Sequence, residues 1–152
     1  MSTRSPSLCK HAVPITIERG GGSVINIASG QGLSGDLVTS AYGSSTVGLT
    51  RFVATAYGDH GVRCNAVAPG LIKSQALDAG MPAPMQELVR QHNLVPRLGK
   101  PDDIAAIVAF LASPAAGFIT GQIIQVDGGF LAHLPTLVPA KQVLAQLAAQ
   151  TE

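Results

Sequence analysis

Three short apolar stretches, each closed by glycine or proline, most constrain the fold of this chain. They lie at 23–28 (SVINIA), 62–68 (VRCNAVA) and 122–127 (QIIQVD) and are rich in β-branched residues. Two helical patterns separate them, from about Thr39 to Tyr57 and from Pro101 to about Ser113. Alternation of strands and helices is typical of a parallel sheet with right-handed crossovers, and strands that are apolar throughout are covered on both faces. The sequence therefore predicts an α/β fold with about three parallel strands flanked by helices.

The remaining segments complete this outline. The patterns predict a helix over Ser7 to Arg19 with a kink at Pro14, a loop over Gly30 to Val38, an irregular stretch over 71–84, and a short helix over Pro84 to Gln91. An amphipathic helix is expected over Pro139 to Gln150, with Val143, Leu144 and Leu147 on one side. We expect one domain over 1–135 and a helical tail over 136–152.

Composition excludes several classes of protein. The chain is 46% hydrophobic and 12% charged with a formal net charge of +1, which argues against disorder and against a nucleic-acid partner. The longest apolar run, Ile104 to Ala112, is far shorter than the roughly 20 residues of a membrane span. Cys9 and Cys64 are read as free thiols of a cytoplasmic protein. We expect no metal site, because no histidine has a ligand partner at a suitable spacing: His11, His60, His92 and His133.

A glycine-rich stretch over Gly30 to Gly35 fits the G-x-G-x-x-G pattern of a phosphate-binding turn after a strand. That turn leads directly into a helix and is followed by an acidic residue about 20 positions on. Here Asp36 to Thr39 intervene before the expected helix, and the acidic window holds Thr55 and Ala56. An ordinary glycine-rich loop is the favoured interpretation, with dinucleotide binding as the alternative.

Ser29 and Tyr42 form a candidate polar pair. Ser29 ends the first strand, where ligands bind in open parallel sheets, and Tyr42 follows thirteen residues later. A serine hydroxyl and a tyrosine phenol together can exchange a proton with a ketone or alcohol oxygen. A phenol of pKa about 10 needs a nearby cation for this, and Thr46, one helical turn on, is uncharged. On spacing alone, a strand-end serine and a packing tyrosine are the favoured interpretation.

Five segments resemble the short-chain dehydrogenase/reductase family in order and spacing: GGGSVINIAS, SAYGSS, GVRCNAVAPGLIKS, RLGKPDDIAAIVAFLAS and ITGQIIQVDGG. The likeness runs from about Ser7 to Phe130. It implies a Rossmann-type fold, NAD or NADP as cofactor, and oxidoreduction of a small secondary alcohol or ketone. It also implies that Tyr42 is the catalytic acid/base and that Ser29 binds the same substrate oxygen. The cofactor residues that it implies are Pro69 and Gly70 against the nicotinamide, and Ile72 and Ser74 at the carboxamide.

The chain departs from the family pattern in the helix that bears the tyrosine. The family has a lysine four residues after the tyrosine, which binds the ribose and lowers the tyrosine pKa. Here the helix reads YGSSTVGLTR over 42–51, about three residues short between Ser45 and Val47, and this lysine is missing. Such a deletion shortens a helix by about 4.5 Å and turns its downstream half by about 60°. We expect the buried face from Val47 to Val53 to be re-seated.

The family's glycine-rich phosphate loop, ribose-binding acid and Asn-Asn-Ala-Gly turn have no counterpart in this sequence. We therefore expect a truncated Rossmann-type sheet whose strand at 23–28 has an unpaired apolar edge. Lys73 or Arg51 would have to replace the missing lysine. We expect little or no turnover. The alternative is a non-enzymatic interaction module that forms a homo-oligomer or pairs with a related full-length chain.

Overall fold

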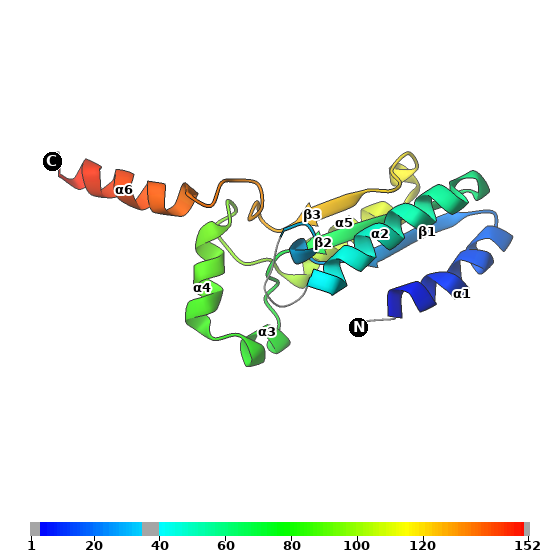
Figure 1. Ribbon diagram of the computed structural model, residues 1–152, viewed down its shortest axis with the longest axis horizontal. Helices are drawn as coiled ribbons and strands as arrows, with labels where there is room; N and C mark the ends of the chain where they lie inside the picture. The colour runs from blue at the N-terminus through cyan, green and yellow to red at the C-terminus, as the bar shows by residue number, and fades with distance from the viewer. Residues whose placement is uncertain (1–3, 35–39, 151–152) are drawn as a thin grey trace.

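The computed structural model describes residues 4–34 and 40–150, with side chains over 7–30, 32–34 and 45–150. The first half contains α1 (Arg4–Glu18), β1 (Gly22–Ile27), the 3-10 turn η1 (Gly30–Gly32), α2 (Ser40–Tyr57), η2 (Gly58–His60) and β2 (Val62–Pro69). The second half contains α3 (Gln75–Gly80), α4 (Ala83–His92), α5 (Pro101–Ala112), η3 (Pro114–Ala116), β3 (Ile123–Val126) and α6 (Leu137–Ala149). Figure 1 shows their arrangement.

The three strands form one parallel sheet in the order β1-β2-β3. Val24 is in register with Cys64, and Val67 with Ile124. The central strand β2 is the most buried because it has a neighbour on both sides, and five consecutive residues of it, Cys64 to Ala68, are fully buried. The prediction of an α/β fold with three parallel strands is confirmed.

Helices cover both faces of the sheet. On one face, α1 and α2 pack Val13 and Val53 against Val24 and Cys64. On the other face, α5 packs against the sheet through Leu111, with Ile25, Val67 and Ile124 among its neighbours. Successive strand residues point to opposite faces, so each apolar strand contributes side chains to the hydrophobic clusters on both faces of the sheet. Ser29, Pro69 and Asp127 thereby come to the same edge of the sheet, where all three strands end.

A buried polar network joins α2 to the sheet. The amide of Asn26 donates to Thr50 Oγ1 at 3.0 Å, and the Thr50 hydroxyl donates to the Thr46 carbonyl at 2.8 Å. Among residues 45–57 of α2, Thr46, Thr50 and Val53 are buried, whereas Val47 is half-buried. In that part of the helix two threonines and one valine contact the sheet side, and Val47, where the buried face was expected to begin, is not fully buried.

The stretch expected to be irregular over 71–84 contains a helix, so that prediction is wrong for α3. Ser74 caps this helix, since its hydroxyl oxygen accepts from Leu77 N at 3.1 Å. The cap was readable as a serine before helix-forming residues. The expected helix at 84–91 is present as α4. Pro14 lies inside α1, which is a continuous helix over its whole described length.

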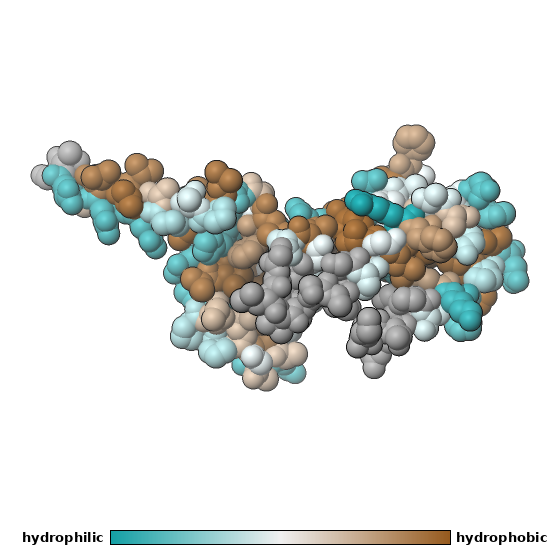
Figure 2. All heavy atoms as spheres, viewed as in Figure 1, coloured by the Kyte–Doolittle hydropathy of each residue, from teal (hydrophilic) through white to brown (hydrophobic). Residues whose placement is uncertain are grey.

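The helix α6 extends away from the sheet (Figure 1). Val143, Leu144 and Leu147 are exposed, and Figure 2 shows hydrophobic atoms along one side of this helix and polar atoms along the other. The expected amphipathic helix is therefore present. Among the helices of the described residues, none has the length and apolarity needed to cross a bilayer.

Candidate active site

A cavity of about 340 Å³ lies at the carboxyl ends of the strands. Residues that follow β1, β2 and β3 form its floor, and the segment that contains α3 and α4 adds a wall. It is lined by Ser29, Gly30, Ser34, Pro69, Gly70, Leu71, Met81, Val89, Asp127, Phe130 and Leu131. Ligands of open parallel sheets bind at this edge, so the cavity is the candidate site.

Ser29 lies in the cavity wall directly after β1. The preceding residue, Ala28, donates its backbone N–H to the Val67 carbonyl at 2.8 Å, and the Ser29 carbonyl accepts from Gly32 N at 2.9 Å. These bonds fix the strand end and the turn on either side of the serine. The backbone of Tyr42 lies in the first turn of α2, but its side chain lies outside the described residues, as does Gly35.

Pro69 and Gly70 line the cavity at the end of β2. Gly70 donates to the Val126 carbonyl at 3.0 Å, and a Cβ at Gly70 would lie 2.8 Å from Asp127 Cα. Real Cβ atoms do not approach this closely, so glycine is required for the close packing of the two strand ends. Ile72 and Ser74 do not line the cavity. Ile72 forms a bridge with Gly99, and Ser74 caps α3.

Asp127 is a cavity residue that sequence reasoning missed. Its Oδ1 accepts from Gly129 N at 2.9 Å and its Oδ2 accepts from Leu131 N at 3.1 Å. Both oxygens therefore hold the turn after β3, which brings Phe130 and Leu131 to the cavity. The signal was available, because Asp127 is a polar residue at a strand end in the same way as Ser29.

Met81 and Val89 were also missed. Met81 follows α3 and Val89 lies on α4, and both line the cavity. Together with Leu71, Phe130 and Leu131 they make the cavity mainly apolar. No local pattern marks these residues, because their role depends on how α3 and α4 are placed over the strand ends.

Neither candidate for the missing lysine lines the cavity. Lys73 forms an ion pair with Asp78 and donates to Gln86 Oε1 at 3.2 Å. The hydrogen bond from Lys73 is the main cause that lowers the pKa of Asp78. Arg51 is exposed on α2. Within the described part of the chain, no group of three His, Cys, Asp or Glu side chains is placed to hold a metal ion.

Comparison with known proteins identifies the relatives of this chain. The family model described as enoyl-(acyl carrier protein) reductase matches residues 2–131. A probable short-chain type dehydrogenase/reductase of Bradyrhizobium diazoefficiens is 51% identical over 131 residues, which are 84% of this chain and 47% of the relative. This chain therefore spans about half the length of the curated relatives that it matches.

Two solved structures share the fold. A short-chain type dehydrogenase/reductase from Mycobacterium ulcerans superposes with a TM-score of 0.80 at 33% identity, over 85% of this chain and 48% of that one. A 7α-hydroxysteroid dehydrogenase in complex with NADH and 7-oxoglycochenodeoxycholic acid superposes with a TM-score of 0.75 at 34% identity. The match covers 80% of this chain and 49% of that one. With the parallel sheet and the matched segments, these similarities establish that the chain belongs to the short-chain dehydrogenase/reductase family.

Proposed function

We propose that this chain carries the nicotinamide and substrate end of an NAD(P)-dependent oxidoreductase that acts on a secondary alcohol or ketone. The observation that carries the proposal is the cavity that joins Ser29 to Pro69 and Gly70 at the carboxyl ends of the strands. A related structure holds NADH and a keto bile acid, and we take NAD or NADP as the cofactor of this chain.

The cavity fits part of such a cofactor. At about 340 Å³ it lies at the low end of the roughly 300–1,000 Å³ typical of small-molecule sites. This space suits a planar ring with a small substrate beside it, and a complete dinucleotide would extend beyond it. The mainly apolar lining suits the ring, and Ser29 is one of the few polar residues in it.

Each residue has a definite role in this proposal. Ser29 donates its hydroxyl proton to the substrate oxygen, and Tyr42 exchanges a proton with that same oxygen. Pro69 and Gly70 would form the surface that holds the nicotinamide, and the cofactor would supply the capacity for hydride transfer when bound. Ile72 and Ser74 do not line the cavity, but they follow the lining residues Gly70 and Leu71 along the chain, and they would bind the carboxamide at its margin. The Ser74 oxygen already accepts from Leu77 N, but its own O–H proton is available to donate.

We propose that turnover by this chain alone is low. A phenol with a pKa near 10 is a poor base at neutral pH unless a cation lies nearby. Thr46 stands one helical turn after Tyr42, and Lys73 is paired with Asp78. Binding is therefore a better first test of the site than activity.

The test is a fluorescence titration of the folded chain with NADH and with NADPH. We expect saturable binding in the micromolar range, which corresponds to about −8 kcal/mol. Nicotinamide mononucleotide should compete and AMP should not, because the proposed site holds the nicotinamide end. Ser29→Ala should bind NADH as the wild type does, since Ser29 acts on the substrate oxygen. Absence of binding by a chain with native circular dichroism would refute the proposal.

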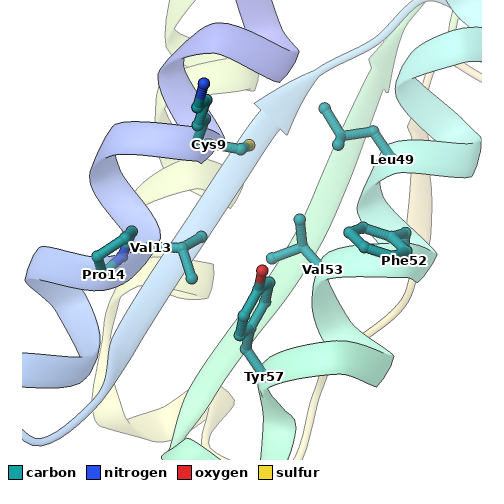
Figure 3. Close-up of a pocket in the computed structure, with 8 residues that line it drawn as sticks. Cys9, Val13, Pro14, Leu49, Phe52, Val53 and Tyr57 are labelled. Carbon is teal, nitrogen blue, oxygen red and sulfur yellow. The ribbon is translucent and has the colours of Figure 1, made fainter.

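A second candidate function is association with a second copy of this chain. The chain exposes 9766 Å² of surface, whereas a compact monomer of this size exposes about 7,200 Å². The excess exceeds the roughly 800 Å² that each partner buries in a standard interface. A groove of about 270 Å³ between α1 and α2 adds apolar surface: Figure 3 shows Cys9 and Val13 of α1 pointing toward Leu49 and Val53 of α2. We propose that this groove pairs with its counterpart on a second copy.

Two further proposals concern organisation and location. We propose that residues 1–135 form the family domain and that 136–152 are an appended helical tail; the family match over 2–131 supports this division. Both cysteines are free and buried. A reducing compartment keeps thiols in that state, and we propose that the protein is cytoplasmic.

A further inference from the structure

A segment that we call the flap, residues 75–92, contains α3 and α4 and stands off the sheet beside the cavity (Figure 1). Short backbone contacts fasten its base. Lys73 N donates to the Gly99 carbonyl at 2.8 Å, and Gly99 N donates to the Leu71 carbonyl at 3.1 Å. Beyond the flap, Val95 N donates to the Gly128 carbonyl at 2.9 Å. The base is therefore fixed, and the end of the flap also meets the chain after β3, because His133 Nε2 lies 2.7 Å from the His92 carbonyl. Between these points, the two helices are held together by contacts within the flap.

Gln86 is the buried residue of α4, with only 8% of its surface exposed. Its Nε2 donates to the Met81 carbonyl at 2.8 Å and to Asp78 Oδ1 at 3.3 Å. Its Oε1 accepts from Lys73 Nζ at 3.2 Å. A primary amide has two N–H donors and one carbonyl acceptor, and all are used here. One side chain thus connects α4 to α3, to the segment between them and to the base of the flap.

Charge strengthens this network. Lys73 and Asp78 form an ion pair, so the carboxylate that accepts from Gln86 is held against a cation. Hydrogen bonds to ionised groups are stronger than those between neutral groups. Removal of the Gln86 amide leaves the Met81 carbonyl without this bond, and the flap loses the link between its two helices, although Lys73 and Asp78 keep their ion pair.

The network is adjacent to the cavity. Met81 follows α3, its N–H is bonded to the Leu77 carbonyl at 2.8 Å, and its own carbonyl is held by Gln86. Its side chain lines the cavity, as does that of Val89, three residues after Gln86 on α4. Met81 is therefore tied directly to the Gln86 side chain, and Val89 is linked to Gln86 only through the helix α4 on which both lie.

We infer that Gln86 is a positioning residue that holds Met81 and Val89 as an apolar wall, against which the alkyl or ring portion of the substrate packs. The inference rests on the proposed function only in taking the cavity as a ligand site. Gln86 touches neither substrate nor cofactor in this scheme, and it acts through Met81.

The methyl group of Met81 can report directly on the position of the cavity wall. Its NMR signal is easy to assign, because the chain has only three methionines, Met1, Met81 and Met85. We would label their methyl carbons with ¹³C, assign them with Met81→Leu and Met85→Leu, and follow Met81 by NMR. Gln86→Ala should shift and broaden the Met81 signal while circular dichroism stays native. Gln91→Ala is the matched control, because Gln91 is exposed on α4 and bonds only Glu87 among the contacts found for it. An unmoved Met81 signal in Gln86→Ala would overturn the inference.

Gln86→Glu keeps the shape of the side chain and separates positioning from loss of fold. Its carboxylate cannot donate to Met81 O or Asp78, so the Met81 signal should move at neutral pH. The charged groups that face it are Lys73 and Asp78. Lowering the pH toward the pKa of the introduced carboxyl restores one O–H donor, and the signal should return toward its wild-type position. A signal that fails to return argues against a positioning role.

A ligand titration links the wall to binding. Cyclohexanol, a small apolar secondary alcohol, should shift the Met81 signal of the wild type in a saturable way. Its affinity should fall at least about twofold in Gln86→Ala, the low end of what one hydrogen bond contributes, and stay unchanged in Gln91→Ala. No response of Met81 to cyclohexanol in the wild type would refute the ligand-facing wall. Failure of the nicotinamide proposal would appear separately, as absence of NADH binding.

Discussion

At the scale of single residues, Asn65 shows how one buried amide holds two parts of the chain together. Its side chain is fully buried on β2, its Nδ2 donates to the Ile119 carbonyl at 2.9 Å, and its Oδ1 accepts from Gln122 N at 3.0 Å. Asn65→Ala would leave Gln122 N without its partner, while the Ile119 carbonyl would keep only the 3.4 Å contact from Arg63. One unsatisfied buried group costs about 1–3 kcal/mol, so we expect urea denaturation to show a loss of at least about 1 kcal/mol. Gln122→Ala, which removes an exposed side chain, should stay within about 0.5 kcal/mol of the wild type; equal effects of the two variants would contradict this account.

The two cysteines lead to a second prediction at this scale. Burial is the largest cause that raises the pKa of Cys64 to about 12, and burial also raises the pKa of Cys9. Only the thiolate reacts with alkylating agents. We therefore expect neither thiol to react with iodoacetamide at neutral pH in the native chain, and both to react once urea unfolds it. Labelling followed by mass spectrometry checks this, and rapid labelling of the native chain would show that the α1–α2 face opens.

Residue by residue, the site could be predicted only in part. Ser29, Pro69 and Gly70 follow strands, and parallel strands bring their carboxyl ends to one edge, so their meeting in the cavity follows from the strand pattern. Asp127 obeys the same rule and was missed. Met81 could not be predicted in this way, because its place in the wall depends on the Gln86 network between two helices.

At the scale of elements, α2 is the helix that is about three residues shorter than the family pattern, and this difference removes the lysine after Tyr42. Its downstream part is seated by the bond between Asn26 and Thr50. We expect that inserting Lys-Ala-Ala after Ser45 turns the start of the helix by about 60° relative to that part and does not produce measurable ketone reduction. The reason is that no glycine-rich phosphate loop of the family pattern accompanies the new lysine. An assay with NADPH and cyclohexanone checks this, with an Ala-Ala-Ala insertion as control. Strong activity of the lysine insertion alone would show that the nicotinamide end suffices.

Strands and long helices were predictable because their apolar patterns and their glycine or proline ends are local. The strand β2 was expected over 62–68 and is found over Val62–Pro69. The short helix α3 was not expected, because it consists of six residues and its signal is the single cap Ser74. Whether a helix this short forms depends on its caps and on tertiary contacts, and the local pattern of apolar residues does not indicate either.

The contact of His133, just before the tail, with the end of α4 should depend on pH. His133 Nδ1 lies 2.9 Å from the Leu134 carbonyl and Nε2 lies 2.7 Å from the His92 carbonyl, so the imidazolium can donate to both. The bond to Leu134 is the largest cause that raises the pKa of His133 above its usual value; Asp127 also raises it, and Lys141 lowers it. Because the pKa of His133 is raised in the folded state, its protonated ring stabilises the fold. This stabilisation is complete below the pKa of the unfolded state and is lost as the pH rises through the pKa of the folded state. We expect limited proteolysis after residue 133 to accelerate over that range. His133→Asn should remove the pH dependence, and His11→Asn, an exposed control on α1, should not.

At the scale of the whole molecule, exposed apolar surface decides how the chain behaves in solution. Phe52 is 62% exposed and Leu8 is 70% exposed on the helices that flank the α1–α2 groove, and β1 has a strand neighbour on one side among the described residues. A partner that binds only the folded chain stabilises it by mass action. If a second copy covers the groove, the thermal midpoint of unfolding should rise with protein concentration, and sedimentation should show a dimer.

Phe52→Lys tests this dependence without disturbing the core, because the side chain is mostly outside it. A buried lysine charge in the interface is costly, so the variant should sediment as a monomer and its midpoint should lose its dependence on concentration. Phe110→Lys, at an exposed position on α5 across the sheet, is the control and should still dimerise. If both variants remain dimers, the groove is not the interface and the open edge of β1 is the surface to test next. A wild type that is monomeric at all concentrations would exclude a second copy and leave a longer relative as the partner.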